Sequence, residues 1–298
     1  MRRSLLFIPG NRPNMIQNGE VLPADALIFD LEDSVPAGDK DAARDLVAGA
    51  LRALDFGSRE CVVRINDLDT KEAKTDLDAM VRAGIHTIMV PKVRGAETIR
   101  SIASLLSDAE GAHGRQEGST ALIALLETAW GIENAMEVAL ASARVTGLAL
   151  GGEDLSADLG CPRTKEGWEI FYSRARLVMA AKAAGIDALD TPFTDVHDFE
   201  GCERDALFAR GLGFTGKLCI SPFHLKAIHQ AFAPSQEEID RAAEVVRAMR
   251  EGEKAGKGAV SLRGKMIDLP VVRQAERVLA LAKAAGLLDD KELDHDPR

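Results

Sequence analysis

Two acidic residues, Glu127 and Asp154, each follow a short apolar run and stand at the start of a turn. The runs cover residues 122–126 and 148–150. An apolar run of this length between turn residues is typical of a strand that is buried on both faces of a parallel sheet. Such strands present polar side chains at their carboxyl ends, where ligands bind in α/β folds. Two carboxylates at two such ends therefore predict a site for a divalent metal ion.

The ligand chemistry of this pair favours a hard cation. Carboxylate oxygens, with further positions open to water and substrate, suit Mg²⁺ or Mn²⁺. The six histidines form no HxH or HExxH pattern and the four cysteines form no CxxC pair, so the sequence does not predict a zinc site. A purely structural interpretation is also open, in which Glu127 is an acid at the start of a helix over 132–141 and Asp154 is a helix N-cap.

Charged residues also stand at the ends of other apolar runs. Arg64 lies inside the run 61–66, where a guanidinium can bind a carboxylate in a bidentate manner or stabilise an enolate oxygen. The alternative for Arg64 is a core ion pair with Asp30 or Glu32. Lys92 follows another run and invites a Schiff-base interpretation, although a lysine that is solvated or paired with an acid is the favoured one.

These side chains need a scaffold that brings strand ends together, and the spacing of the apolar runs indicates one. Segments with helical periodicity lie between most runs, and several of them end at a glycine. The runs recur about every 30 residues, which is the length of a strand and helix unit. No GxGxxG or Walker A pattern is present. The sequence therefore predicts a (β/α)8 TIM barrel in preference to a doubly wound sheet. The eight candidate strands cover residues 4–9, 26–32, 61–66, 87–92, 121–127, 147–152, 187–192 and 216–221.

The chain continues well past the eighth run. We expect residues 1–230 to form the barrel and residues 231–298 to form a C-terminal helical extension. Pro234 followed by acids opens one helix, and an amphipathic run through Leu281 forms another. Such an arm can cover the chain's own site or a neighbouring subunit, and packing on a neighbouring subunit is the arrangement we predict.

Composition excludes several classes of function. The chain has 298 residues, is 46% hydrophobic and 28% charged, and carries a formal net charge of −10. This acidic balance argues against nucleic-acid binding, which needs a basic face. The first apolar run stops at Pro9, too early for a signal peptide, and no stretch is long enough to span a bilayer. We therefore expect a cytoplasmic protein without membrane or nucleic-acid partners.

The order and spacing of several motifs resemble the citrate lyase β-subunit-like family of CoA-thioester lyases. This family includes malyl-CoA and citramalyl-CoA lyases and belongs to the aldolase/citrate lyase (HpcH/HpaI) superfamily. The resemblance extends almost from end to end of the chain. The motifs are Arg3-Ser4-Leu5-Leu6-Phe7, Asn11-Arg12-Pro13, Phe29-Asp30-Leu31-Glu32-Asp33-Ser34-Val35, Val63-Arg64-Ile65-Asn66, Pro91-Lys92, Leu126-Glu127-Thr128, Gly152-Glu153-Asp154-Leu155-Ser156-Ala157-Asp158-Leu159-Gly160 and Gly264-Lys265-Met266-Ile267-Asp268.

The resemblance implies roles for individual residues. Glu127 and Asp154 would bind Mg²⁺, and Arg64 would contact the reacting carbonyl or enolate. Arg12 would help to hold the CoA phosphates, and Asp268 would reach into an adjacent subunit as the acid/base. The acidic shell around the metal would be formed by Asp30, Glu32 and Asp33.

The start of the helix after Glu127 has an expected role as well. Its backbone N–H groups, in the stretch Thr128, Ala129 and Trp130, would receive the substrate carboxylate. Asp268 has a structural alternative as a helix N-cap two residues before Pro270. In one respect the sequence departs from the family, because Ser221-Pro222 stands where family members usually carry His-Pro.

The implied reaction is Mg²⁺-dependent cleavage or formation of a 3-hydroxyacyl-CoA, such as malyl-CoA or citramalyl-CoA, with acetyl-CoA and a 2-oxo acid as products. The alternatives are an acyl-CoA thioesterase on the same metal site, a citryl-thioester lyase subunit and a non-catalytic CoA-binding barrel. The implied assembly is a homo-oligomer, a trimer or a hexamer, and CoA enters as part of the substrate.

Overall fold

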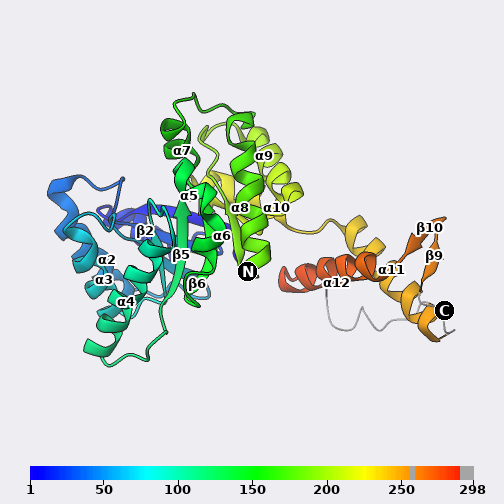
Figure 1. The fold of residues 1–298 in the computed structure, drawn as a ribbon, viewed down its shortest axis with the longest axis horizontal. Coiled ribbons are helices and arrows are strands. Elements are labelled where there is room, and N and C mark those ends of the chain that lie inside the picture. Colours follow the sequence, from blue (N-terminus) through cyan, green and yellow to red (C-terminus); the bar gives the residue numbers. More distant parts are fainter. Residues whose placement is uncertain (255–258, 289–298) are drawn as a thin grey trace. The chain divides into compact units, whose positions relative to one another are not determined.

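All eight predicted strands form, and they close into a parallel barrel in sequence order (Figure 1). The computed structural model describes residues 1–254 and 259–288. The prediction of a (β/α)8 barrel is confirmed. Seven strands end one or two residues earlier than predicted, so the polar residues at those positions lie in the loops at the mouth of the barrel. The strands are β1 (Ser4–Pro9), β2 (Ala26–Asp30), β3 (Glu60–Arg64), β4 (Thr87–Val90), β5 (Ala121–Leu126), β6 (Val145–Leu150), β7 (Asp187–Asp190) and β8 (Gly216–Cys219).

Helices follow the strands and surround the barrel (Figure 1). The single helix predicted over 132–141 is instead two short helices that meet at Asn134. The α-helices of this part are α1 (Pro13–Asn18), α2 (Lys40–Ala53), α3 (Glu72–Arg82), α4 (Ala96–Ala112), α5 (Ala129–Glu133), α6 (Ala135–Ala139), α7 (Gly152–Asp158), α8 (Phe171–Ala184), α9 (Phe199–Leu212) and α10 (Leu225–Phe232). The 3₁₀ helices are η1 (Ala37–Asp39), η2 (Trp168–Ile170) and η3 (Pro222–His224).

The interior of the barrel is filled by apolar side chains from every strand. Alternation along each short strand sends one set of residues inward, and branched or long apolar residues fill the centre as in other barrels of this size. The barrel is therefore a packed core, and chemistry is confined to its ends. The interior cluster consists of Leu5, Ala26, Ile28, Val62, Met89, Ile123, Leu125, Ala149, Leu189 and Leu218, with Phe7 packed against it.

The strand register brings charged residues side by side at the carboxyl end of the barrel. Pro9 lies opposite Asp30, and Asp30 lies opposite Arg64 on the next strand. On the other side, Leu126 at the end of β5 lies opposite Leu150 at the end of β6. Residues that directly follow β5 and β6 therefore enter the same space.

A buried cluster of four charged residues joins β7 and β8 to the helices outside them. Arg174 on α8 forms two hydrogen bonds of 2.9 Å with Asp190 and one of 2.7 Å with Asp205 on α9. The Lys217 ammonium lies 2.6 Å from both of these carboxylates and donates to the Thr191 carbonyl oxygen at 2.7 Å. Each positive side chain of this buried cluster therefore lies within hydrogen-bond distance of two acidic ones.

The chain divides into two compact units, Arg2–His229 and Gln230–Arg298. The second unit contains α11 (Gln236–Lys254), α12 (Leu269–Ala284) and an antiparallel hairpin of β9 (Val260–Leu262) and β10 (Lys265–Ile267). Helical periodicity did not predict this hairpin. Its two-residue turn has positive φ angles at Arg263 and Gly264, as a tight hairpin turn requires. Residues 255–258 and 289–298 of the predicted extension lie outside the described residues.

The second unit has its own apolar core, which explains why it forms a separate body. This core consists of Ile239, Ala242, Val245, Val246, Met249, Ile267, Val272, Ala275, Leu279 and Ala282.

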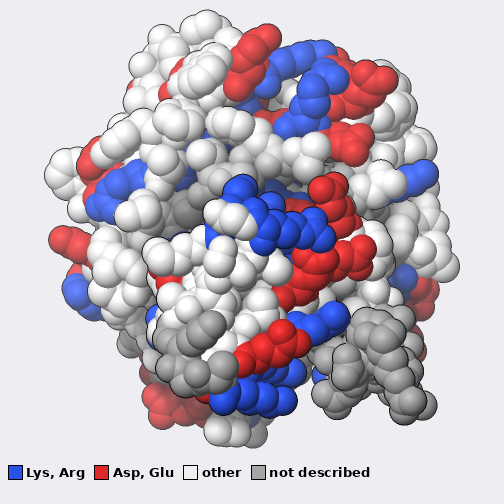
Figure 2. Space-filling view, turned by 90° about the vertical axis from the view of Figure 1, so that its right-hand side faces the viewer, with Lys and Arg blue, Asp and Glu red and all other residues white. Residues whose placement is uncertain are grey.

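Neither a membrane-spanning helix nor a basic surface is seen in the part of the chain that the structure describes. No helix of the described residues is long and apolar enough to cross a membrane. On the face drawn in Figure 2, the described Lys and Arg side chains lie among Asp and Glu side chains and form no continuous basic field.

Candidate active site

A cavity of about 470 Å³ opens at the carboxyl end of the barrel. Its walls include Glu127, Asp154, Arg64 and Asp30, together with the apolar side chain of Phe7. The structure therefore brings four of the residues expected from the sequence into one site. This is the end at which (β/α)8 enzymes carry their active sites.

Glu127 is a buried carboxylate with little compensation from the protein. Its side chain follows β5, is 2% exposed, and accepts one hydrogen bond of 2.6 Å from the Lys92 backbone N–H. Burial and the negative charges of Glu32 and Asp154 together raise the pKa of Glu127 to about 8, and the Lys92 N–H and the charge of Arg64 offset this effect only in part. A cation in the cavity would remove this penalty.

The Gly151 backbone packs closely against the Glu127 side chain. A Cβ at Gly151 would lie 2.6 Å from the Glu127 carboxylate oxygen Oε2, so only glycine fits beside it. Asp154 is exposed in the first turn of α7 and lines the same cavity. The two carboxylates therefore share one space, as the spacing of the two strands predicts.

Asp30 and Arg64 form a bidentate ion pair. The Arg64 Nε and Nη2 atoms donate to the two Asp30 oxygens at 2.7 and 2.8 Å. Burial alone would raise the pKa of Asp30, but the hydrogen bonds and charge of Arg64 outweigh it and lower the pKa. The Arg64 guanidinium also lies 4.8 Å from the centre of the Phe7 ring. The core ion pair that was one interpretation of Arg64 is thus present, and the same guanidinium faces the cavity.

Glu32 connects Arg64 to Lys92. Its Oε2 lies 3.1 Å from Arg64 Nη1, and its Oε1 accepts a hydrogen bond of 2.7 Å from Lys92 Nζ. Asp33 lies further out, 3.8 Å from Arg64 and 3.7 Å from Lys92. Burial raises the pKa of Glu32, and the charges of Arg64 and Lys92 only partly offset this effect. Asp30, Glu32 and Asp33, at the end of β2 and in the loop that follows it, therefore all lie against Arg64, and Glu32 and Asp33 also lie against Lys92.

Lys92 is held in a way that disfavours Schiff-base chemistry. Burial alone would lower its pKa, but the hydrogen bond and charge of Glu32 and the charge of Asp33 raise it. A Schiff-base lysine needs a lowered pKa. Lys92 also has a left-handed backbone conformation with φ of 51°, which is uncommon for a residue with a side chain. This conformation directs its N–H at Glu127.

The oxygen ligands fit a magnesium ion. Among the residues that the structure describes, no three His, Cys, Asp or Glu side chains form a group that could hold a metal ion. Mg²⁺ is usually held by one or two carboxylates and keeps its other positions for water and substrate. Glu127, whose burial is only partly compensated, and Asp154 meet this requirement.

The helix start after Glu127 is engaged by the chain itself. Thr128 caps α5 by accepting a hydrogen bond of 3.1 Å from the Gly131 N–H. The Ala129 N–H, expected to receive a substrate carboxylate, donates at 2.7 Å to the carboxylate of Asp158 from α7. Trp130 is 68% exposed. Asp158 lies in the motif Gly152–Gly160. Its contact with Ala129 joins two separate helices, so the sequence alone could not predict it.

Three other residues singled out from the sequence lie elsewhere. Arg12 is exposed in the loop between β1 and α1. Ser221 accepts a hydrogen bond of 3.3 Å from the Phe223 N–H and so caps η3. Asp268 belongs to the second unit and caps α12, because its carboxylate accepts a hydrogen bond of 3.3 Å from the Val271 N–H. The structural alternative for Asp268 is therefore present.

The structure is a closed (β/α)8 barrel, and the cavity at its carboxyl end contains two acids, Glu127 and Asp154, and Arg64. These features place the chain in the class of (β/α)8 barrel enzymes. Comparison with known proteins identifies the family within this class. The profile of the HpcH/HpaI aldolase/citrate lyase family matches residues 3–222. The chain belongs to this family, and it is a lyase.

Similar proteins agree with the family. The chain is 44% identical to the citrate lyase subunit beta of Leuconostoc mesenteroides subsp. cremoris, over 98% of this chain and 96% of that protein. It is 36% identical to the mouse mitochondrial citramalyl-CoA lyase, over 94% and 86%, and 34% identical to a (3S)-malyl-CoA thioesterase of Cereibacter sphaeroides, over 95% of both chains. Among solved structures, the CitE protein of Mycobacterium tuberculosis in complex with magnesium, acetoacetate and coenzyme A has a TM-score of 0.79 and 33% identity, over 94% of this chain and 98% of that one.

Proposed function

We propose that this enzyme is a Mg²⁺-dependent carbon–carbon lyase that cleaves a 3-hydroxyacyl-CoA, such as malyl-CoA or citramalyl-CoA, to acetyl-CoA and a 2-oxo acid. The observation that carries the proposal is the buried Glu127 carboxylate, which shares a cavity with Asp154 and the Arg64 guanidinium. Similar proteins are named as lyases of citrate and citramalyl-CoA, and one is solved with magnesium and CoA.

Glu127 and Asp154 are the proposed protein ligands of Mg²⁺, with Mn²⁺ as a substitute. The ion supplies Lewis-acid polarisation of the substrate oxygens when it is bound. Glu127 is oriented for this role by the Lys92 N–H, and the Gly151 backbone packs closely beside its carboxylate. Asp30, Glu32 and Asp33 form the acidic shell, which holds Arg64 and Lys92 in place.

Arg64 is the proposed catalytic residue for the thioester half of the substrate. Cleavage breaks the bond between the carbinol carbon and the carbon next to the thioester, and its electron pair passes to a thioester enolate. The hydroxyl proton passes to solvent as the ketone or aldehyde of the 2-oxo acid forms, and the enolate carbon then gains one proton, so the reaction releases no net proton. Because Asp30 fixes the guanidinium on one side, Arg64 would meet the enolate oxygen in a preset orientation.

The carboxylate of the 2-oxo acid is proposed to bind beside Glu127, at the backbone of Thr128, Ala129 and Trp130. In the structure a carboxylate of the chain, Asp158, accepts the Ala129 N–H at 2.7 Å. This contact supports the proposal that the amide suits a carboxylate. Asp158 would then have to give up the hydrogen bond when the substrate binds.

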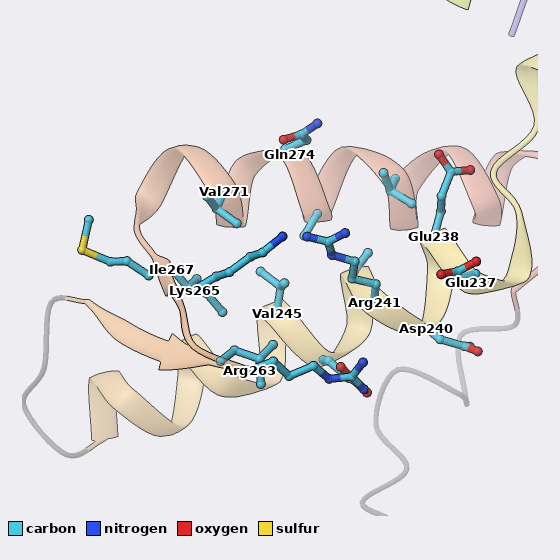
Figure 3. Close-up of a pocket in the computed structure, with 16 residues that line it drawn as sticks. Glu237, Glu238, Asp240, Arg241, Val245, Arg263, Lys265, Ile267, Val271 and Gln274 are labelled. Atoms are coloured by element: carbon cyan, nitrogen blue, oxygen red, sulfur yellow. The ribbon is translucent and has the colours of Figure 1, made fainter. Parts of the chain in front are cut away.

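Asp268 is the proposed acid that protonates the enolate carbon, acting from a neighbouring subunit. The hairpin and helix on either side of it line a groove of about 870 Å³ in the second unit together with α11, and Arg241 and Lys265 extend into this groove (Figure 3). Asp268 itself lies between Ile267 and Val271, both of which line the groove. A homotrimer or hexamer in which this unit serves a neighbouring barrel would complete the site.

Two further parts of the proposal concern CoA and location. Arg12 is exposed in the loop after β1, where its charge is available to the CoA phosphates. The four cysteines are all free thiols in the structure, which suits a reducing compartment and supports a cytoplasmic location.

A product analysis tests the reaction. Incubation with Mg²⁺ and malyl-CoA, citramalyl-CoA or citryl-CoA should release acetyl-CoA and a 2-oxo acid in equal amounts from at least one substrate. Glu127→Ala should abolish the release, and Glu137→Gln, an exposed acid on α6, should not affect it.

A thioesterase is the second candidate, because one similar protein carries that name. Free CoA together with the intact hydroxy acid, without acetyl-CoA, would establish the thioesterase and refute the lyase. Release from citryl-CoA alone would instead indicate a citryl-thioester lyase subunit. No turnover of any of the three thioesters, with CoA still bound, would indicate a non-catalytic CoA-binding barrel.

A further inference from the structure

The position of Asp154 depends on the backbone that carries it. Within the described part of the chain, no hydrogen bond or ion pair holds the Asp154 carboxylate, in contrast to the Lys92 N–H that holds Glu127. Asp154 is the third residue of α7, a helix of seven residues. The distance between the two carboxylates is therefore set by whatever fixes the first turn of α7.

Two hydrogen bonds fix this turn from opposite sides. The Gly151 N–H donates to the Leu126 carbonyl oxygen at 3.0 Å and ties the turn to the end of β5. The Gly152 N–H donates to the Thr191 hydroxyl at 2.9 Å and ties it to the loop after β7. The contact with Thr191 is close, because a Cβ at Gly152 would lie only 2.7 Å from the Thr191 hydroxyl oxygen.

Thr191 is itself held from the outer side of the barrel. Its carbonyl oxygen accepts a hydrogen bond of 2.7 Å from Lys217, whose ammonium also binds Asp190 and Asp205. Thr191 is fully buried, and it also lines the cavity of the site. The buried charge cluster of β7 and β8 thus ends at the residue that fixes α7.

We propose that Thr191 is a positioning residue for the metal site, because its hydroxyl fixes the start of α7 and thereby the distance of Asp154 from Glu127. Loss of the hydroxyl leaves the buried Gly152 N–H without an acceptor, so the first turn of α7 shifts to regain one. This inference rests on the proposed Mg²⁺ site. It adds a residue that would not touch the metal and would control its affinity.

The test measures Mg²⁺ binding by isothermal titration calorimetry in the absence of substrate, so that catalysis does not enter. Thr191→Val preserves the side-chain shape and removes the acceptor, and should raise the dissociation constant of Mg²⁺ by roughly tenfold or more. Thr191→Ser retains the hydroxyl and should bind within about twofold of the wild type.

Thr215→Val is the matched control at the opposite end of β7. The Thr215 hydroxyl accepts from the Ala188 N–H at 3.2 Å and donates to the Ala188 carbonyl at 3.0 Å. Its loss should lower the melting temperature without changing Mg²⁺ affinity. If Thr191→Val does not fold, as judged by circular dichroism, Thr191→Ala removes the same acceptor without adding a methyl group against Gly152.

The outcomes separate this inference from the proposed function. If the wild type does not bind Mg²⁺, or if Glu127→Gln binds it as the wild type does, the metal site and the inference both fail. If the wild type binds, Glu127→Gln does not, and the folded Thr191 variant without a hydroxyl binds with wild-type affinity, only the inference is overturned. An equal loss of affinity in Thr191→Ser would also overturn it, because the hydroxyl would then not be the cause.

Discussion

Replacement of Glu127 by glutamine should stabilise the metal-free protein while it destroys the proposed metal site. The Glu127 carboxylate is 2% exposed, and its burial, together with the charges of Glu32 and Asp154, raises its pKa from 4.5 to about 8. Glutamine has nearly the same shape and no charge. Its amide oxygen can still accept the Lys92 N–H, so the packing of the site should be preserved.

The size of the effect follows from the pKa and from pH. Below pH 4.5 the carboxyl group is protonated in both the folded and the unfolded chain, so it costs nothing. As the pH rises from 4.5 toward 8, the unfolded chain releases the proton and the folded chain retains it, so folding stability falls. At pH 7 the cost is about 3 kcal/mol, since each pKa unit corresponds to about 1.4 kcal/mol. In a unit of this size, this corresponds to roughly 6–12 °C in melting temperature.

Thermal denaturation in EDTA, followed at several pH values, measures this difference. Glu127→Gln should melt above the wild type at pH 7, and the gap should close toward pH 4.5. Addition of Mg²⁺ should raise the melting temperature of the wild type and leave the variant unchanged. A variant that is less stable than the wild type in EDTA at every pH would refute the view that the burial of the Glu127 carboxylate is only partly compensated.

Three further predictions concern other parts of the molecule. Glu110 is buried, and burial alone would raise its pKa, but hydrogen bonds from Arg144 and from the loop at Thr120 lower the pKa to about 2. The ionised Glu110 therefore contributes about 3 kcal/mol to the free energy of unfolding above pH 4.5, and this contribution falls by about 1 kcal/mol by pH 3.5. Urea denaturation should show this loss in the wild type and not in Glu110→Gln, and equal slopes against pH would contradict the assignment. Borohydride with a 2-oxo acid should leave Lys92 unmodified, because Glu32 keeps its ammonium protonated, and a mass increase on that peptide would show Schiff-base chemistry. Mixed oligomers of inactive Asp268→Asn and Glu127→Ala chains should regain activity, and no recovery after verified subunit exchange would count against an acid donated between subunits.

The strands of the barrel could be predicted because each is a short apolar run that ends at a turn, a local signal. The carboxyl ends of the strands were less predictable. Polar residues such as Glu32 and Lys92 continue the apolar run in the sequence, but in the structure they lie in the loops after the strands. The hairpin of β9 and β10 was missed because its strands are three residues long and its turn is marked only by Arg263-Gly264.

The acids and the arginine of the site could be predicted from their places at strand ends, but their partners could not. Parallel register makes Asp30 a neighbour of Arg64, and sequence alone left an ion pair and a substrate contact as alternatives. The hydrogen bond between Ala129 and Asp158, and that between Gly152 and Thr191, join elements far apart in the chain. Such contacts depend on how helices settle against the barrel, and no spacing in the sequence records them.

The most direct test of the central claim is the initial rate of acetyl-CoA release from malyl-CoA or citramalyl-CoA as Mg²⁺ is titrated into EDTA-treated protein. If Glu127 and Asp154 hold the catalytic ion, the treated wild type should be inactive, and its rate should rise to saturation with Mg²⁺. Glu127→Ala should remain inactive over the whole titration. Cleavage at the full rate in EDTA would contradict the account.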